Sequence, residues 1–365
     1  MEGEEHFELM SKKLRHNMDE QFNAKGYIAK DKWSETNLID DVSEAKLCKF
    51  LNDSSCDDDV KILEEKFITQ DNGQFTYGSV SIKNKSGSIG LVQFVVKVKN
   101  IDCDVIDAFI ISELNLIVGG SNVISTHMII NLIFAQLLGY EIKEEMDGEI
   151  TLPIVAISLA GNRFNLSALS HHQIDLELFL QKRCLGISLD RCKIYIKPEV
   201  SAEHMEENKV VSTQHKYCFS SGQILPFNYI CNYIIFTPNT NFRESCFDSS
   251  QKIYPEIESV CISRTNKNYT IKFDNNLGEI TKFDIMGKIF YGLPLSPQLK
   301  NKKGLKTFLE NKSTEHIHGI NFSRMDDIRL YINTSASSDN YEYNVWALGY
   351  NIFRTHRGMG GLAYA

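Results

Sequence analysis

The sequence lacks the features of an exported or zinc-dependent protein. Its nine cysteines include no Cys-x-x-Cys pair, the spacing that is typical of zinc and redox sites. Because the set is odd in number and scattered, we expect reduced thiols. The first residues, Met-Glu-Gly-Glu-Glu, have neither the basic start nor the apolar run of a signal peptide. We therefore expect a reducing, cytoplasmic environment.

Long apolar runs and an excess of positive charge are missing as well. A membrane-spanning helix takes about 20 predominantly apolar residues, whereas the most apolar stretch, 114–138, is interrupted by glycine, serine, asparagine and histidine. The formal net charge is −8, and residues 67–365 hold 29 Lys and Arg against 30 Asp and Glu. Attraction to nucleic acid needs a positive field, so we predict no direct contact with it. The one basic cluster, 300–306, we interpret as a solvated loop.

Residues 1–66 differ from the rest of the chain. Phe7, Met10 and Leu14 recur at helical spacing, and a second helix is predicted to begin near Asp41. The segment holds 10 Lys and Arg against 17 Asp and Glu. We predict a helical, acidic appendage whose apolar face is covered by the body of the chain or by a partner. The alternative is a partly disordered arm.

From about residue 67 the hydrophobic period changes to two. Residues 92–98 and 174–181 alternate between apolar and polar side chains, as half-buried strands do. Only one long helix is predicted, over 122–138, before Gly139. A parallel α/β fold would need a helix after nearly every strand, so the pattern indicates an all-β protein. Further strands are predicted over 75–82, 152–159, 193–197, 229–236, 269–273, 328–332 and 343–353.

The length of 365 residues predicts two domains beside the appendage. We place them at 67–184 and 185–365, because an alternating run ends at this boundary. The segments 199–224, 238–252 and 291–318 are long and polar, and we interpret them as loops. Loops at the ends of a β-sandwich often make contacts between subunits.

Two histidine pairs are the candidate metal ligands. In a strand, His316 and His318 would share a face and could bind a metal, as in cupin-type jelly rolls. No further ligand has a suitable spacing, so we predict no metal. His171 and His172 are adjacent and would point to opposite faces.

Two other motifs share residue types with catalytic or nucleotide-binding sequences but lack the spacing of those motifs. Ser323 is not part of a Gly-x-Ser-x-Gly elbow. Gly358, Gly360 and Gly361 neither follow the spacing of a nucleotide fingerprint nor open a helix, and we interpret them as a tight path past a packed neighbour. We predict no catalytic residue, no cofactor-binding residue and no enzymatic activity.

Two C-terminal segments carry a family resemblance. Gly319-Ile-Asn-Phe-Ser-Arg-Met-Asp-Asp-Ile-Arg-Leu330 resembles the Asn-Phe-Ser-Arg-Ile-Asp strand of the major capsid proteins of nucleocytoplasmic large DNA viruses. The end of the chain, from Tyr343 to Tyr364, resembles that family's terminal Asn-Tyr-Asn and Gly-Met-Gly-Gly sequence. Upstream, 114–124 resembles its strand and Ile-Gly-Gly turn, and 152–178 a later strand pair. The resemblance covers about 67–365.

This resemblance implies two antiparallel jelly-roll sandwiches that stand side by side, each of about eight strands. It also implies a viral structural protein, made late, that forms a homotrimeric, pseudo-hexagonal capsomer of an icosahedral-type shell. Its partners would be itself, neighbouring capsomers and minor capsid proteins. The resemblance further implies assembly in the host cytoplasm and a location in the virion. There the protein would lie close to an internal membrane without being inserted in it. A carbohydrate-binding jelly roll and a cupin-like metalloenzyme stay open as alternatives.

Overall fold

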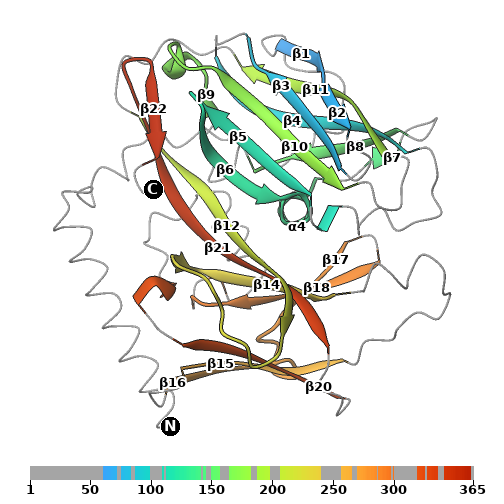
Figure 1. Cartoon of the computed structure of the whole chain (residues 1–365), viewed down its shortest axis with the longest axis vertical. Helices are drawn as coiled ribbons and strands as arrows, with labels where there is room; N and C mark the ends of the chain where they lie inside the picture. Colours follow the sequence, from blue (N-terminus) through green and yellow to red (C-terminus); the bar gives the residue numbers. More distant parts are fainter. Residues whose placement is uncertain are drawn as a thin grey trace.

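The structure is a computed structural model in which strands dominate (Figure 1). Most of the expected appendage, residues 1–60, lies outside the described residues. Residues 61–66 form a strand, β1, which corrects the helical prediction for these six residues, because β1 pairs along its whole length with a later strand. The structure describes residues 61–71, 75–83, 87–98, 109–110, 112–140, 143–144, 149–156, 164–181, 187–197, 206–239, 256–264, 269–285, 287–296, 299, 319–324, 327–335 and 341–362.

The first sandwich consists of two antiparallel sheets, which we call sheets A and B. The chain passes repeatedly from one sheet to the other, and the first strand of sheet A lies beside the last, as in a jelly roll. Sheet A has the order β1 (Lys61–Lys66), β11 (Ile187–Lys197), β4 (Ser88–Val98), β8 (Glu149–Ile154) and β7 (Lys143–Glu144), with β9 (Phe164–Asn165) paired to β4. Sheet B has the order β2 (Ile68–Asp71), β3 (Phe75–Ser81), β10 (Ile174–Gln181), β5 (Glu113–Val118) and β6 (Ser121–His127).

The second sandwich repeats this order without a sequence repeat. Again the first and last strands of one sheet are neighbours. In the other sheet, Ile224 forms a single bridge to Arg329, at the position where a further edge strand would lie. Sheet C has the order β12 (Glu206–Ser220), β21 (Glu342–His356), β14 (Tyr233–Pro238), β18 (Lys288–Pro294) and β17 (Thr281–Ile285), with β22 (Met359–Leu362) paired to β21. Sheet D has the order β16 (Tyr269–Asp274), β15 (Ile257–Arg264) and β20 (Ile328–Thr334), and β13 (Ile230–Cys231) pairs with β19 (Ile320–Asn321). The predicted fold, two jelly rolls side by side, is confirmed.

The apolar residues at alternate positions of the predicted strands are the ones that are buried in the sandwich cores. On β10, Ile174, Leu176, Leu178 and Leu180 are fully buried, and the side chains between Ile174 and Leu180 are partly buried or exposed. The inward side chains of β4 are buried in the same way. Burying one such side chain stabilises the fold by about 1.5–3 kcal/mol. The hydrophobic period of two therefore fixes which face of each sheet points into the core.

The predicted helix over 122–138 is only half correct. The residues up to His127 form the strand β6 instead of a helix. The helix itself, α4, begins at Met128 and ends at Leu137. Val123, Ile124 and Thr126 are β-branched, and β6 hydrogen-bonds to β5, so pairing and side-chain shape both favour a strand there. In the described part of the chain no helix is long and apolar enough to cross a membrane.

Strand pairing also differs from the expected division at residues 184 and 185. β11 lies after that division, yet it pairs with β1 on one side and β4 on the other, so it closes the first roll. The expected loop at 199–224 contains β12, a strand of 15 residues. Its sequence is mostly polar and shows no clear alternation, but β21 supplies a partner for it from Glu206 to Ser220. The break in pairing falls between Lys197 and Glu206.

The C-terminal hairpin crosses from the second roll to the first. Arg357 and Gly358 both have positive φ, as a two-residue hairpin turn requires, and the Gly358 carbonyl accepts a hydrogen bond from the His171 amide. A Cβ atom on Gly360 would lie 2.5 Å from both Leu169 Cδ2 and Phe353 Cζ. The structure thus agrees with a tight path at Gly358 and Gly360, whereas the prediction was wrong for Gly361, where a Cβ atom would meet nothing within 4 Å.

Replacing Gly360 by alanine is expected to lower the free energy of unfolding by about 1–3 kcal/mol, because the new methyl group overpacks this contact. Gly361 is the matched control, since a Cβ atom there would meet nothing within 4 Å. Its replacement by alanine is expected to change stability by less than about 0.5 kcal/mol. Urea unfolding of the two variants measures the difference, and equal effects would contradict the described path of β22.

Candidate functional site: the seam and the outer faces of the first roll

Sheet C is buried on both faces. One face, with Ile234, Phe236 and Val345, packs against sheet D in the core of the second roll. The other face carries Ile235 and Trp346 and belongs to the same hydrophobic cluster as the core of the first roll. We call this second contact, between sheet C and the elements β6 and α4 of the first roll, the seam. The seam joins the two rolls into one packed unit.

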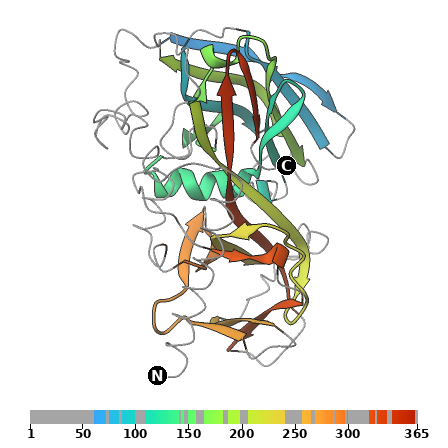
Figure 2. The same ribbon diagram turned by 90° about the vertical axis from the view of Figure 1, so that its left-hand side faces the viewer.

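Helix α4 lies between the two rolls (Figure 2). Its residues from Met128 to Ala135 are all buried, which fits a helix that is apolar on every side and packed on every side. Gln136 donates a hydrogen bond of 2.8 Å to the Asp284 carbonyl on sheet C. At the opposite edge of sheet C, the Thr213 hydroxyl of β12 donates to the Ser125 carbonyl of β6 at 2.9 Å. Polar contacts thus fix the seam at two places.

Asn131 holds α4 to the first roll. Its side chain is fully buried, and its amide group donates to the Pro153 carbonyl at 2.8 Å. Its carbonyl oxygen accepts the backbone amides of Val155 and Ala156 at 2.8 and 3.1 Å. A buried amide with all these bonds made fixes one position of the helix, because any shift would leave buried groups unpaired.

A pair of histidines from different rolls meets in the seam. His127 ends β6, and His215 lies on β12, with ring centroids 4.4 Å apart. The ring of His215 also stacks on Trp346 at 4.9 Å and 16°. His127 Nδ1 donates to the Ile110 carbonyl at 3.2 Å, and His215 Nε2 lies 3.3 Å from the Asn344 side-chain oxygen. Each ring therefore has one N–H group held by a neutral acceptor.

Burial keeps this pair neutral. It lowers the pKa of His127 to about 4. Burial and then the neighbouring His127 lower the pKa of His215 to about 3. Hydrogen bonds to the Ile110 carbonyl and to Asn344 act in the opposite direction but are the smaller effects.

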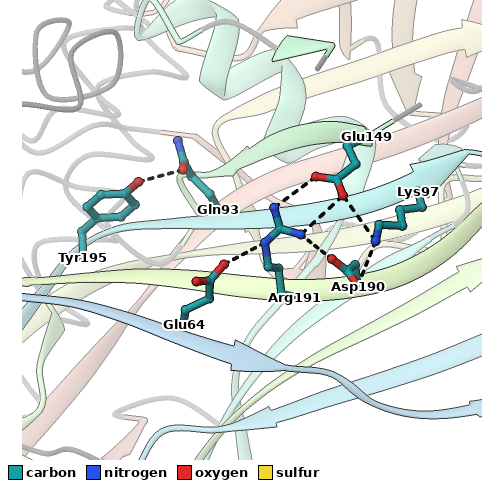
Figure 3. Close-up of polar contacts among 7 residues, drawn as sticks. All are labelled: Glu64, Gln93, Lys97, Glu149, Asp190, Arg191 and Tyr195. Carbon is teal, nitrogen blue, oxygen red and sulfur yellow. Dashed lines mark hydrogen bonds and ion pairs between the residues drawn. The ribbon is translucent and has the colours of Figure 1, made fainter. Parts of the chain in front are cut away.

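The outward face of sheet A carries a network of ion pairs (Figure 3). Arg191 lies at its centre, with Nε 2.7 Å from Glu64 and Nη2 3.0 Å from Glu149, and it also pairs with Asp190. Lys97 adds contacts of 3.3 and 3.5 Å to Glu149 and Asp190. Hydrogen bonding by Arg191 lowers the pKa of Glu149, and Lys97 adds to this shift. The network is partly exposed, so salt weakens it and its contribution to stability is small.

The outward face of sheet B is aromatic and acidic. Ile68, Phe75 and Phe179 are 68%, 38% and 38% exposed. Tyr77 lies against Phe179, with ring centroids 4.8 Å apart, and its hydroxyl donates to Glu177. Burial first, and the bond to Glu177 second, raise the pKa of Tyr77 to about 12.

This aromatic face has a single sign of charge. Glu113 lies opposite Phe179 in register, and Asp175 and Glu177 are on the same face of β10. None of the outward residues on the described strands of sheet B is Lys or Arg. An exposed apolar patch with a polar rim is typical of a protein interaction surface.

The structure does not bring the sequence candidates together as a catalytic or metal site. His316 and His318 lie outside the described residues. His171 is exposed and contacts the C-terminal hairpin, and Ser323 donates its hydroxyl to the Asn321 side chain at 2.6 Å within a short turn. Among the described residues there is no group of three or more His, Cys, Asp or Glu that could hold a metal.

Neither the seam nor its histidines are predicted by the sequence. No pattern near His127 or His215 links the two, since 88 positions separate them. The only local signal was the run Val345 to Leu348, which is apolar on both faces and therefore typical of a strand that is buried on both sides. The sequence predicts this run only as part of the strand over 343–353.

The fold defines a class of protein, the double jelly rolls. Within it, the chain is similar to the crystal structure of VP54 of the virus PBCV-1, fitted into a reconstruction of the virophage Sputnik, with a TM-score of 0.56 and 14% identity over 84% of this chain and 97% of that chain. A quasi-atomic model of the PBCV-1 virus capsid matches with a TM-score of 0.55, 14% identity and the same coverage. Neither a family model nor a curated protein matches the sequence. The expected resemblance to large-DNA-virus capsid proteins is confirmed for the fold.

Proposed function

We propose that the chain is a non-enzymatic structural protein of a virion, a capsid subunit that forms homotrimeric, pseudo-hexagonal capsomers of an icosahedral-type shell. The observation that carries this proposal is the repeated jelly-roll order in sheets A to D, a fold that matches a chain of the PBCV-1 virus capsid over 97% of that chain's length. Two rolls per subunit give a trimer six similar walls, and such an outline tiles a shell. Neighbouring capsomers and minor capsid proteins would be its further partners.

The two outer faces of the first roll support a ring of identical subunits. A threefold ring needs heterologous contacts, in which one patch of each copy meets a different patch of the next. The sheet B face is aromatic and acidic, whereas sheet A directs Lys66, Lys97, Arg191 and Lys193 outward beside three carboxylates. We propose that a second copy of this chain covers the sheet B face and presents lysine side chains, such as Lys66 and Lys193, to it.

Light scattering of the purified chain tests this proposal. The wild type is expected to have three times the mass of 41.6 kDa, and Phe179→Ser combined with Ile68→Ser is expected to weaken the trimer at least about tenfold. The loss arises because exposed aromatic and aliphatic anchors dominate most interfaces. Leu277→Ser is the control, since Leu277 is 74% exposed on a turn of the second roll.

Three results would separate the parts of the proposal. Only monomer at micromolar concentration would contradict the trimer. A wild-type trimer that is unchanged in the double variant would contradict the sheet B contact alone. An equal loss in Leu277→Ser would show that the effect is not specific to that face.

A further inference from the structure

We propose that the seam between the two rolls is an acid-sensitive joint, in which protons taken up by His127 and His215 favour separation of the rolls. This inference goes beyond the proposed function and does not depend on assembly. It rests first on placement: one ring comes from β6 of the first roll and the other from β12 of the second, and they are in direct contact. A charge on either ring therefore acts on the contact that joins the rolls.

The surroundings of the pair oppose a positive charge. His127 is 9% exposed, and it is also the N-cap residue of α4, where the helix dipole is positive. The first turn of α4 holds no acidic residue that could offset a charge. Trp346 on β21, Ile235 on β14 and Phe290 on β18 are uncharged and fully buried.

Two neighbours act in the other direction, and both are weaker. Glu113 lies opposite His127 on β5, but its side chain is exposed and therefore solvated. Stacking on Trp346 would stabilise a protonated His215 by a cation–π contact, which is equal to about 1.5 pH units. Burial and the second histidine lower the pKa of His215 from 6.5 to about 3, which is the larger effect. Tyr217 is a further neighbour, with its ring centroid 6.3 Å from that of His215.

The sign of the pH dependence follows from these values. In an open seam both rings regain an ordinary pKa near 6.5, whereas in the closed seam the values are about 4 and about 3. The closed seam is therefore favoured fully above pH 6.5, and that advantage is lost as the pH falls toward 4. At about pH 5 the equilibrium constant for opening should rise about 30-fold for each histidine that is released.

Trp346 provides a reporter within the seam. The chain has two tryptophans, so Trp33→Phe leaves Trp346 as the only one. As the pH falls from about 7 to about 4.5, we expect its emission to shift to longer wavelength while the far-ultraviolet circular dichroism of the sheets is retained. Such a shift means that water has entered the seam before the rolls unfold.

Matched variants assign the transition to the pair. His127→Asn keeps a donor at the position of Nδ1, and His215→Gln keeps one at the position of Nε2, but neither can take up a proton. In the double variant the shift in Trp346 emission is expected to disappear above about pH 4.5. His356→Asn is the control, because His356 is exposed next to the hairpin turn, and it should leave the transition unchanged.

Two results would overturn the inference. One is an emission of Trp346 that stays constant in the Trp33→Phe parent down to about pH 4.5. The other is a double variant that retains the transition of the parent. If the double variant does not fold, the parent and the single variant His215→Gln still decide, since removing one proton-accepting ring should shift the midpoint to lower pH. An unshifted midpoint would contradict the proposal.

Discussion

A chain that ends at Asp339 is expected not to fold into a soluble protein. β21 lies between β12 and β14 inside sheet C, and it is the only partner of β12 in the described pairing. Its side chains enter both the seam and the core of the second roll. Each large buried side chain that is lost costs about 2–5 kcal/mol, and the whole domain is stable by about 5–15 kcal/mol. The summed loss of several buried side chains therefore exceeds the free energy of unfolding of the domain.

Expression and a thermal melt measure this effect. A chain that ends at Gly361 is the control, because it keeps β21 and most of β22, and it is expected to fold and to lose only strength of assembly. A cooperative melt from the chain that ends at Asp339 would show that sheet C does not need β21, and the second jelly roll as described would be wrong.

Trp346→Ala is expected to lower the free energy of unfolding by about 3–5 kcal/mol. Trp346 is fully buried in the seam, and its removal leaves a cavity between β21, β12 and the first roll. Because one hydrophobic cluster spans the first roll and the seam, we expect both rolls to unfold in a single transition at neutral pH, where the seam is closed. Urea unfolding, followed by circular dichroism, gives both the size of the loss and the number of transitions.

Trp346→Phe is the matched control, since it keeps an aromatic ring at the same place and should recover most of the stability. A loss below about 1 kcal/mol in Trp346→Ala would mean that the seam is open in solution. Two separate transitions in the wild type would mean that the rolls fold independently, so the seam would not join them.

The fold could be predicted from the sequence for strands that are buried on one face only. On β10 and β4, inward and outward residues alternate, so the period of two gave both the strands and their buried faces. β12 has no such alternation, and the predicted loop at 199–224 was wrong because the partner strand β21 lies far along the chain. The helix prediction included most of β6 because Asn122, just after Gly119 and Gly120, stands where an N-cap would, ahead of a run that ends at Gly139.

The candidate site was less predictable than the fold. Gly358 and Gly360 were interpreted as a tight path for the tail, and their contacts with Ser170, His171 and Leu169 agree. The seam depends instead on which face of sheet C packs against the first roll, and no local sequence pattern indicates that face. His127 and His215 become neighbours only through this contact between rolls, so neither residue could be selected beforehand.

Electron microscopy of the purified full-length chain tests the central proposal most directly. If the chain is a capsid subunit with two jelly rolls, particles averaged without imposed symmetry should show a threefold assembly with six lobes, two from each subunit. Isolated two-lobed particles, or dimers with twofold symmetry, at a concentration where a shell protein would assemble, would contradict it.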